Sequence, residues 1–466
     1  MESQYSLRKE AFTTKNHKVQ ILLNFINVLC LGIGLVTSNF NVVAAAALIQ
    51  MAFGMLALLV RGYNLLSFPV VFYGMCYLFH GGYLFLMLFN QRAGNLYMFR
   101  EYLTADTQVQ VGKFVLLFFA FLLLGMTSRP GKIRFVKESK PVLTLNQTKI
   151  IGGCIFLLCL GPRLYVDLKF VFEYLETGIY KTMDSMNNYI LILADGFYVG
   201  GILLIIGYRN HVKKAVAVLA VCFMVLAVSM ISGNRGIKVA YFLALIVFYF
   251  AFVEKGKLKA TRLFLYIVFG YTFLALIATF GDLREGVQIT VSSFINVFLK
   301  NFSYKLIVDQ LGEFGYAAFS LGATVESFGE IGYLGGKMYL LSWLQIFPNV
   351  GGMLDGFSDS LNYVMMLPSK YRYSLGGSLL GEYFANFGYL AFVFSYLLGR
   401  FIRTAYQKLQ DAILSEELSA FALLIILAIP KSFIWIRSVF NEFPRSVIWY
   451  FVMIIALKLL LYRKKI

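Results

Sequence analysis

The stretch RLFLYIVFGYTFLALIATF, residues 262–280, is one of the apolar runs that cover most of this chain. It exceeds the roughly 18 residues that an α-helix needs to cross the hydrocarbon of a bilayer. Because no water reaches the backbone there, a spanning run must satisfy its own hydrogen bonds, which a helix does. The sequence shows no barrel-type alternation of polar and apolar residues. The run therefore predicts a transmembrane helix.

Composition extends this prediction to the whole chain of 466 residues. Hydrophobic residues make up 59% and charged residues 14%, and the mean hydropathy is +0.72, whereas a soluble domain carries about 25% charged residues. The first run lacks a small-residue cleavage site, so we expect it to be retained. The chain is predicted to be an all-α polytopic membrane protein with about twelve transmembrane helices, at 19–37, 41–60, 65–89, 109–127, 149–168, 188–207, 214–231, 237–253, 262–280, 384–402, 418–436 and 446–462.

The apolar pattern pauses once, over residues 281–383. This segment is too long for a simple hairpin and too apolar for a tethered soluble domain, so we expect one large loop that caps the membrane helices. Residues 291–309 place Phe294, Phe298 and neighbouring apolar residues on one face, which predicts an amphipathic helix suited to the bilayer surface. Met338 to Phe347 is too short to span and predicts a re-entrant or interfacial helix. The predicted regions are helices one to nine over 1–280, the loop over 281–383, and helices ten to twelve over 384–466.

The distribution of Lys and Arg along the chain predicts its orientation in the membrane. Lys/Arg clusters fall at every second connection, at 8–18, 129–140, 209–214, 255–259, 403–408 and 463–465. By the positive-inside rule these face the cytoplasm, which puts both termini inside and the loop over 281–383 outside. The formal net charge of +18 is therefore mostly an orientation signal with attraction to anionic lipid. A nucleic-acid partner is excluded because the chain offers no basic soluble module.

The sequence predicts neither a metal site nor a cofactor. All five cysteines lie inside predicted spans, where buried, reduced packing residues are the expected state. No nucleotide-binding glycine loop, nucleophile elbow or Asp-x-Asp pair is found. His80 lies within a predicted span beside Gly81 and Gly82, and we interpret it as a packing residue, with a role as a catalytic base as the less favoured alternative.

Several Lys and Arg residues lie on the predicted outer side, where the positive-inside rule expects few cations. Guanidinium groups match phosphate oxygens with paired hydrogen bonds, so one interpretation is an outward-facing pocket for a diphosphate. The alternative is that each cation binds a lipid headgroup, snorkels to the interface or pairs with a neighbouring carboxylate such as Asp282 or Glu442. The residues are Arg163, Arg235, Arg284, Lys431, Arg437 and Arg445.

External carboxylates are the candidates for acid–base chemistry. Glu326 and Glu382 stand out because they flank the predicted re-entrant helix in sequence contexts rich in glycine and aromatic residues. Each could equally be a helix cap or an ion-pair partner. The full set is Asp282, Glu285, Glu326, Glu330, Glu382 and Glu442.

Four local features resemble the Wzy-type O-antigen and capsule repeat-unit polymerases. They are Ser-Gly-Asn-Arg-Gly at 232–236, Phe-Gly-Glu-Ile-Gly-Tyr from Phe328 with the run that ends at Pro348, the Asn-Phe-Gly-containing stretch at 376–390, and the Arg after a Pro at 430–437. Asn349 stands after Pro348, where the family often has a basic residue.

The resemblance implies a glycosyltransferase of the bacterial cytoplasmic (inner) membrane. It would polymerise repeat units of O-antigen or capsular polysaccharide carried on undecaprenyl diphosphate, without a metal, and a chain-length regulator and a flippase are the protein partners that fit this role. Arg235, Arg284 and Arg437 would clamp the diphosphate, with Arg163 and Arg445 in support. Arg284 would also be catalytic, and Glu326 or Glu382 would be the base for the acceptor hydroxyl. An O-antigen-type ligase and a lipid-linked oligosaccharide flippase stay open as alternatives, although a flippase predicts short loops.

Overall fold

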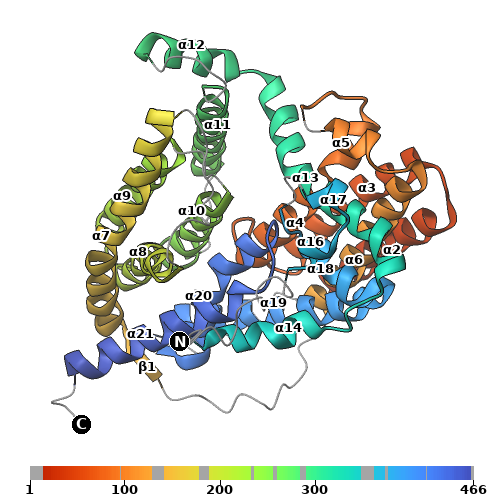
Figure 1. The fold of residues 1–466 in the computed structure, drawn as a ribbon. Helices are drawn as coiled ribbons and strands as arrows, with labels where there is room; N and C mark the ends of the chain where they lie inside the picture. The colour runs from red at the N-terminus through yellow and green to blue at the C-terminus, as the bar shows by residue number, and fades with distance from the viewer. Residues whose placement is uncertain are drawn as a thin grey trace. The chain divides into compact units, whose positions relative to one another are not determined.

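The computed structural model describes residues 14–94, 96–128, 141–177, 188–231, 236–255, 260–283, 290–347, 362–372, 376–415 and 417–462 (Figure 1). Over this part of the chain the fold is almost entirely helical. Its one sheet is an antiparallel pair of short strands, β1 (Pro141–Thr144) and β2 (Glu417–Ser419). The predicted all-α class is therefore confirmed.

Eight helical stretches in the described residues are long and apolar enough to cross a membrane. They lie in α2 (Thr14–Val36), α3 (Phe40–Val60), α4 (Phe68–Leu88), α6 (Ala105–Thr127), α7 (Leu145–Thr177), α8 (Asn188–Gly207), α18 with α19 (Leu379–Phe387 and Ala391–Leu414) and α21 (Glu442–Tyr462). The chain is thus a multi-pass membrane protein.

The other predicted spans also coincide with helices. These are α9 (Val212–Ile231), α10 with the π-helix η2 (Gly236–Phe248 and Tyr249–Val253), α11 (Ala260–Asp282) and α20 (Ala420–Trp435). Apolar stretches within the last three are shorter than a full span, at Ile237–Val253, Ile267–Leu276 and Ala420–Trp435. The total of about twelve crossings stays a prediction.

The segment predicted as a loop is itself mostly helical where it is described. It contains α12 (Val291–Asn301), α13 (Tyr304–Ile331), α14 (Lys337–Ser342), η3 (Trp343–Ile346), α16 (Tyr363–Met366) and α17 (Ser369–Arg372). The single amphipathic helix expected over 291–309 is divided, because α12 ends at Asn301 and α13 starts at Tyr304. Figure 1 shows α12 across the end of α11, where Asn301 donates a hydrogen bond to Asp282 Oδ2 at 2.9 Å. The location of this segment outside the membrane stays a prediction.

The chain packs into two compact units that alternate along the sequence. Unit 1 comprises residues 1–135, 311–338 and 356–407, and unit 2 comprises residues 136–310, 339–355 and 408–466. This division follows packing. The predicted division into 1–280, 281–383 and 384–466 follows membrane topology and stays a prediction.

In unit 1, buried amide side chains connect the helices. Gln50 of α3 donates to the carbonyl of Leu116 at 3.1 Å and accepts from the Tyr77 hydroxyl at 2.5 Å. A polar group in an apolar environment must be hydrogen-bonded, so these contacts fix the register of α3, α4 and α6.

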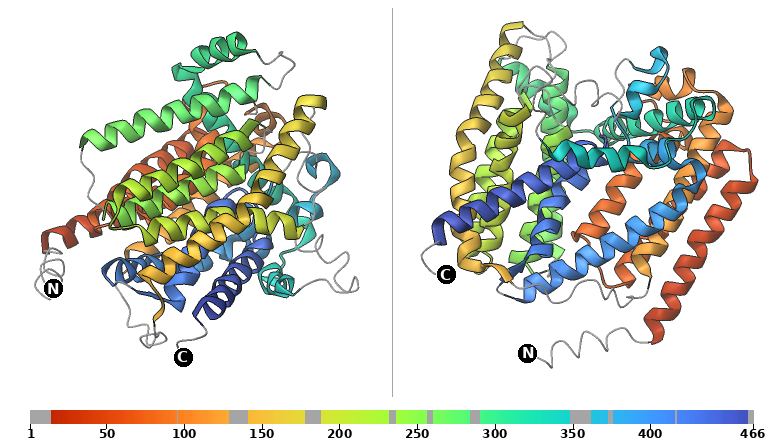
Figure 2. Two further views of the ribbon diagram at one scale, coloured as in Figure 1. Left: turned by 90° about the vertical axis from the view of Figure 1, so that its left-hand side faces the viewer. Right: turned by 60° about the horizontal axis from the view of Figure 1, so that its bottom comes forward.

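In unit 2, α7 runs alongside α8 and α9 (Figure 1 and Figure 2). Glycines allow α7 and α8 to approach with their backbones almost touching: a Cβ added at Gly200 would lie 2.5 Å from the backbone nitrogen of Phe156, and one at Gly207 would lie 2.7 Å from the Cα of Lys149. Small residues at helix interfaces are typical of membrane helix packing. This contact sets the distance between the polar side chains that the two helices carry.

We expect Gly200→Ala to destabilise unit 2, because the new methyl group meets backbone atoms that cannot turn away. Overpacking of this kind costs about 1–3 kcal/mol, which should appear as a lower apparent Tm of the purified protein in detergent. The matched control is Gly161→Ala on α7, where an added Cβ meets nothing within 4 Å. Equal Tm values for the two variants would contradict the close packing of α7 on α8.

Candidate functional site

Unit 2 contains five charged side chains that alternate in sign, which we call the charge chain: Lys238, Asp167, Arg163, Asp195 and Lys431. Arg163 stands at its centre. The guanidinium donates to both carboxylate oxygens of Asp167, with Nε at 2.7 Å from Oδ2, and its Nη1 donates to Asp195 Oδ1 at 3.3 Å. One guanidinium thus joins two carboxylates.

Each carboxylate also contacts a lysine at an end of the chain. Lys238 Nζ lies 3.2 Å from Asp167 Oδ1, and Lys431 Nζ lies 3.3 Å from Asp195 Oδ2. The Tyr241 hydroxyl donates to the same Asp195 oxygen at 3.0 Å. Three cations against two carboxylates leave one positive charge in excess.

Four helices build this arrangement. Arg163 and Asp167 are one helical turn apart on α7, where a spacing of four residues puts side chains on the same face. Asp195 comes from α8, Lys238 from α10 and Lys431 from α20. Arg163 and Lys431 each directly follow a proline inside their helix. Proline removes a backbone hydrogen-bond donor and bends a helix. Both cations therefore follow a point where the regular hydrogen bonding of their helix is interrupted.

Aromatic rings surround the cations. The rings of Tyr198 and Tyr241 stack with their centroids 4.7 Å apart. The Arg163 Cζ lies 5.7 Å from the Tyr198 centroid, and the Lys431 Nζ lies 5.6 Å from the Tyr241 centroid. A cation within about 6 Å of an aromatic face is stabilised by the ring's quadrupole, more so when water is excluded.

The charge chain is almost fully buried at one end and slightly exposed at the other. The side chains of Arg163, Asp167 and Lys238 are 1–2% exposed, whereas that of Lys431 is 10% and that of Asp195 is 18% exposed. Ionisable groups among membrane helices are costly unless they are paired, and they mark functional sites. An excess cation with an accessible end is suited to an anionic ligand.

The predicted diphosphate-binding arginines differ in their surroundings. Arg163 is neutralised by its two aspartates. Arg445 donates to Glu442 Oε1 at 3.0 Å, as the ion-pair alternative predicts. Arg437 lies half-buried in the turn after α20, and within the described part of the chain no ion pair is found for it. Arg235 and Arg284 lie outside the described residues.

Glu326 lies in unit 1 on α13. Its Oε1 accepts from the Tyr371 hydroxyl at 2.7 Å and from Lys370 Nζ at 3.0 Å, while its Oε2 receives one longer contact, from the Thr107 hydroxyl at 3.4 Å. Partial burial alone would raise the pKa of Glu326, but the hydrogen bonds from Tyr371 and Lys370 lower it below the ordinary glutamate value. The carboxylate is therefore ionised at neutral pH.

Glu382 is fully buried in unit 1, in the first turn of α18. The Ser378 hydroxyl caps this helix by accepting from the Gly381 N–H at 3.1 Å. His80 Nδ1 lies 2.8 Å from the Cys76 carbonyl, and its Nε2 lies 2.9 Å from the Ser378 hydroxyl. The imidazole therefore has a partner on both sides, which agrees with the interpretation of His80 as a packing residue.

Four members of the site were missed in the sequence. Asp167, Asp195, Lys238 and Tyr241 have no motif of their own, and their partners are distant in sequence. The Arg163–Asp167 spacing of one helical turn in an apolar run was the available signal. All five cysteines are free thiols, and the described residues hold no group of His, Cys, Asp and Glu suited to a metal ion.

Apolar helices joined by a buried, net-cationic charge chain define a polytopic membrane protein with a candidate anion site. A family model, O-antigen polysaccharide polymerase Wzy, matches residues 19–466, nearly the whole chain. The chain belongs to this family, which confirms the resemblance and implies a polymerase that acts on lipid-linked glycans within a membrane. Comparisons with curated proteins and with solved structures gave no match.

We expect Asp195→Leu to destabilise the protein strongly, because it leaves Arg163 and Lys431 short of a counter-charge among apolar helices. Removal of one partner from a buried ion pair costs about 3–5 kcal/mol. The double variant Asp195→Leu/Lys431→Leu should regain part of the lost Tm, since it removes the unpaired ammonium as well.

The control cycle uses Lys169 and Glu173, whose side chains are 35% and 28% exposed on α7 and whose charged atoms are 3.9 Å apart. An exposed pair contributes about 0–1 kcal/mol. Additive Tm losses in the Asp195/Lys431 cycle would mean that the two charges are not coupled.

Proposed function

We propose that this chain polymerises oligosaccharide repeat units linked to undecaprenyl diphosphate, at the outer face of the bacterial cytoplasmic membrane. The growing glycan on one lipid carrier is the donor, and a repeat unit on a second carrier is the acceptor. The observation that carries the proposal is the charge chain with its excess cation and its slightly exposed Lys431 end. Membership of the polymerase family supplies the reaction class.

The depth of the charge chain supports an outer-face site. Lys238 is two residues from the start of α10 and Asp195 seven from the start of α8, and Lys431 is four residues from the end of α20. Under the predicted topology these three helix ends all face outward. Both termini would then be cytoplasmic.

Lys431 and Arg437 are our candidates for direct contact with the diphosphate. They are six residues apart, Lys431 lies at the accessible end of the charge chain, and Arg437 keeps a guanidinium without an ion pair in the described residues. Arg163 already has two carboxylates, so we assign it to holding Asp195 and Lys431 in place. We also assign Arg235, Arg284 and Arg445 to the proposed clamp, as the family resemblance implies.

In the proposed reaction, an acceptor hydroxyl oxygen attacks the anomeric carbon of the donor glycan. A new C–O bond forms, and the bond from that carbon to the diphosphate oxygen breaks, with its electron pair staying on the diphosphate. Positive groups fixed where this negative charge develops stabilise the transition state. Cations of the protein would thereby take the role that a metal ion plays in other diphosphate-releasing enzymes.

The hydroxyl proton needs an acceptor, and Glu326 is our first candidate. It is ionised and a quarter exposed, and among the described residues its Oε2 has only the long contact from Thr107, which leaves this oxygen available. Glu382, the other predicted base, is fully buried. We therefore assign Glu382 a structural role in the first turn of α18. An O-antigen-type ligase would use the same leaving group and stays the nearest alternative.

We expect purified protein to convert synthetic prenyl-diphosphate repeat units into a ladder of longer products, in excess chelator as well as without it. Arg437→Lys keeps the charge but loses the paired hydrogen bonds of the guanidinium, so the rate should fall about 10²-fold. Gel analysis of products against time gives the rate. Lys169→Met, a change of an exposed cation on α7, is the matched control and should retain the full rate.

A normal rate for Arg437→Lys at matched protein levels would assign Arg437 to lipid anchoring. Loss of the ladder in chelator with rescue by Mg²⁺ would overturn metal independence. Transfer of a single glycan to another lipid acceptor, with no ladder, would favour the ligase.

We expect Glu326→Gln to lower kcat by about 10²-fold or more with KM little changed. In the unaltered protein the midpoint of the acidic limb of the pH–rate profile should lie below the ordinary pKa of a glutamate, because Lys370 and Tyr371 favour the ionised form of Glu326. Activity is thus present above that pKa and lost as the pH falls through it. Lys370→Met removes one stabilising donor and should move this limb to higher pH. A limb that stays in place would remove Glu326 from the proton transfer.

A further inference from the structure

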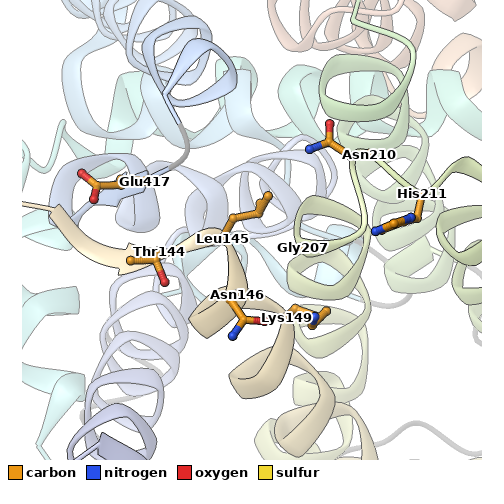
Figure 3. A pocket seen from close by; sticks show the side chains of 8 residues that line it. All are labelled: Thr144, Leu145, Asn146, Lys149, Gly207, Asn210, His211 and Glu417. Carbon is orange, nitrogen blue, oxygen red and sulfur yellow. The ribbon is translucent and has the colours of Figure 1, made fainter. Parts of the chain in front are cut away.

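Unit 2 contains a cavity of about 400 Å³ between the first turn of α7, the turn from α8 to α9, and strand β2 (Figure 3). Lys149, His211 and Glu417 are among its lining residues. Figure 3 shows the Glu417 carboxylate pointing away from the other two side chains, so these polar groups do not converge on one ligand. A different surface of unit 2, beside the turn between α20 and α21, has a clearer chemical character.

The segment of residues 339–347, which comprises the end of α14, η3 and the residue after it, exposes one apolar face. Its members are between 44% and 73% exposed, and they are Leu340, Trp343, Leu344 and Phe347. Spacings of three, four and seven residues put side chains on the same side of a helix. The segment contains no charged residue. This apolar face is therefore suited to a partner without charge or water.

The other side of the segment packs on the ends of two membrane helices. The ring centroid of Tyr339 lies 6.2 Å from that of Trp435 at the end of α20, and 5.3 Å from that of Phe440 in the following turn. The indole N–H of Trp449, on α21, donates to the carbonyl of Ile346 at 3.0 Å. The segment is thus fixed near both of its ends, and its apolar face is the side that does not make these contacts.

The contact with α21 gives the depth of the segment in the membrane. The 21 residues of α21 are long and apolar enough to cross a bilayer, and their length of about 31 Å matches the hydrocarbon layer. Trp449 comes seven residues after Glu442, where α21 begins, which is about 10 Å along the helix. An amphipathic helix at a bilayer surface buries its apolar face to about 5–10 Å. The segment lies at this depth.

The surroundings of the apolar face identify lipid as its partner. Trp449 is itself 38% exposed, and Val452, one turn further along α21, is 52% exposed. The apolar face therefore adjoins the exposed side of a spanning helix, which acyl chains cover. Tryptophan is also the residue that membrane proteins favour at the level of the headgroups, and two of the three tryptophans of this chain, Trp343 and Trp449, lie here.

We propose that residues 339–347 form an interfacial anchor, with the apolar face inserted among the acyl chains of the leaflet that the turn between α20 and α21 faces. Of the two alternatives that the sequence left open for this segment, the geometry favours an interfacial helix over a re-entrant one. Because Tyr339 contacts Trp435, the anchor also fixes the depth of the turn that carries Arg437. The anchor does not depend on the proposed glycosyl transfer.

The test uses the fluorescence of the three tryptophans in the full-length protein, placed in nanodiscs of phosphatidylcholine with brominated acyl chains. Bromine quenches a tryptophan that it contacts. Bromine near the glycerol end of the chain should quench Trp343 more than bromine near the methyl end, and aqueous iodide should quench it little. Trp343→Phe should therefore remove a large part of the intensity that the shallow bromine quenches. Trp435→Phe is the matched control and should leave that quenched intensity unchanged, because Trp435 is only 7% exposed.

Three outcomes would overturn the anchor. Stronger quenching of Trp343 by the deep bromine would show a re-entrant segment, and strong quenching by iodide would show a segment in water. Protection from both reagents would show that protein, such as a second copy of this chain, covers the apolar face. Should Trp343→Phe fail to fold, Phe347→Trp is the second variant, since it adds an indole on the same face. Added fluorescence that the shallow bromine does not quench would reject the anchor as well.

Discussion

A guanidinium among apolar helices must be paired, and the arrangement of unit 2 depends on how Arg163 is paired. Its two carboxylates come from different helices, and each carboxylate holds a lysine from a third or fourth helix. Ion pairs in a low-dielectric interior contribute little net stability, but loss of one partner is costly. The charge chain therefore acts mainly to specify one relative placement of α7, α8, α10 and α20, since a shifted helix would leave a charge unpaired.

The glycine contact between α7 and α8 and the charge chain depend on each other. The Gly200 contact brings the two backbones together, which allows Arg163 to reach Asp195 at 3.3 Å. Without that contact the guanidinium would face a gap, and without the charges the helices could slide, because van der Waals packing of small residues is weakly directional. Packing thus sets the distance between the two helices, and electrostatics sets their register.

Sequence reasoning located the helices well because apolar runs are local signals. It also singled out Arg163, Lys431, Arg437 and Glu326 by their type and position. It could not find Asp167, Asp195 and Lys238 as their partners, since those contacts join helices far apart in the chain. The long helix α13 was missed because its polar face lowers its average hydropathy, and the division of the helix expected over 291–309 depends on the backbone conformation at Phe302, where the chain turns. Lys370 and Tyr371 were likewise not predicted beside Glu326.

The cations that give the net charge of +18 differ in how far they are solvated, and therefore in how much a bound anion would stabilise them. Cations at helix ends are solvated by water and headgroups, so each needs no specific partner. The excess positive charge of the charge chain is different, because three of its five side chains are almost fully excluded from solvent. A bound anion at the Lys431 end, where the charge chain is partly exposed, would neutralise that excess. Few other cations of unit 2 stand to gain as much from an anionic ligand, which is why the charge chain, rather than the more numerous surface lysines, carries the functional argument.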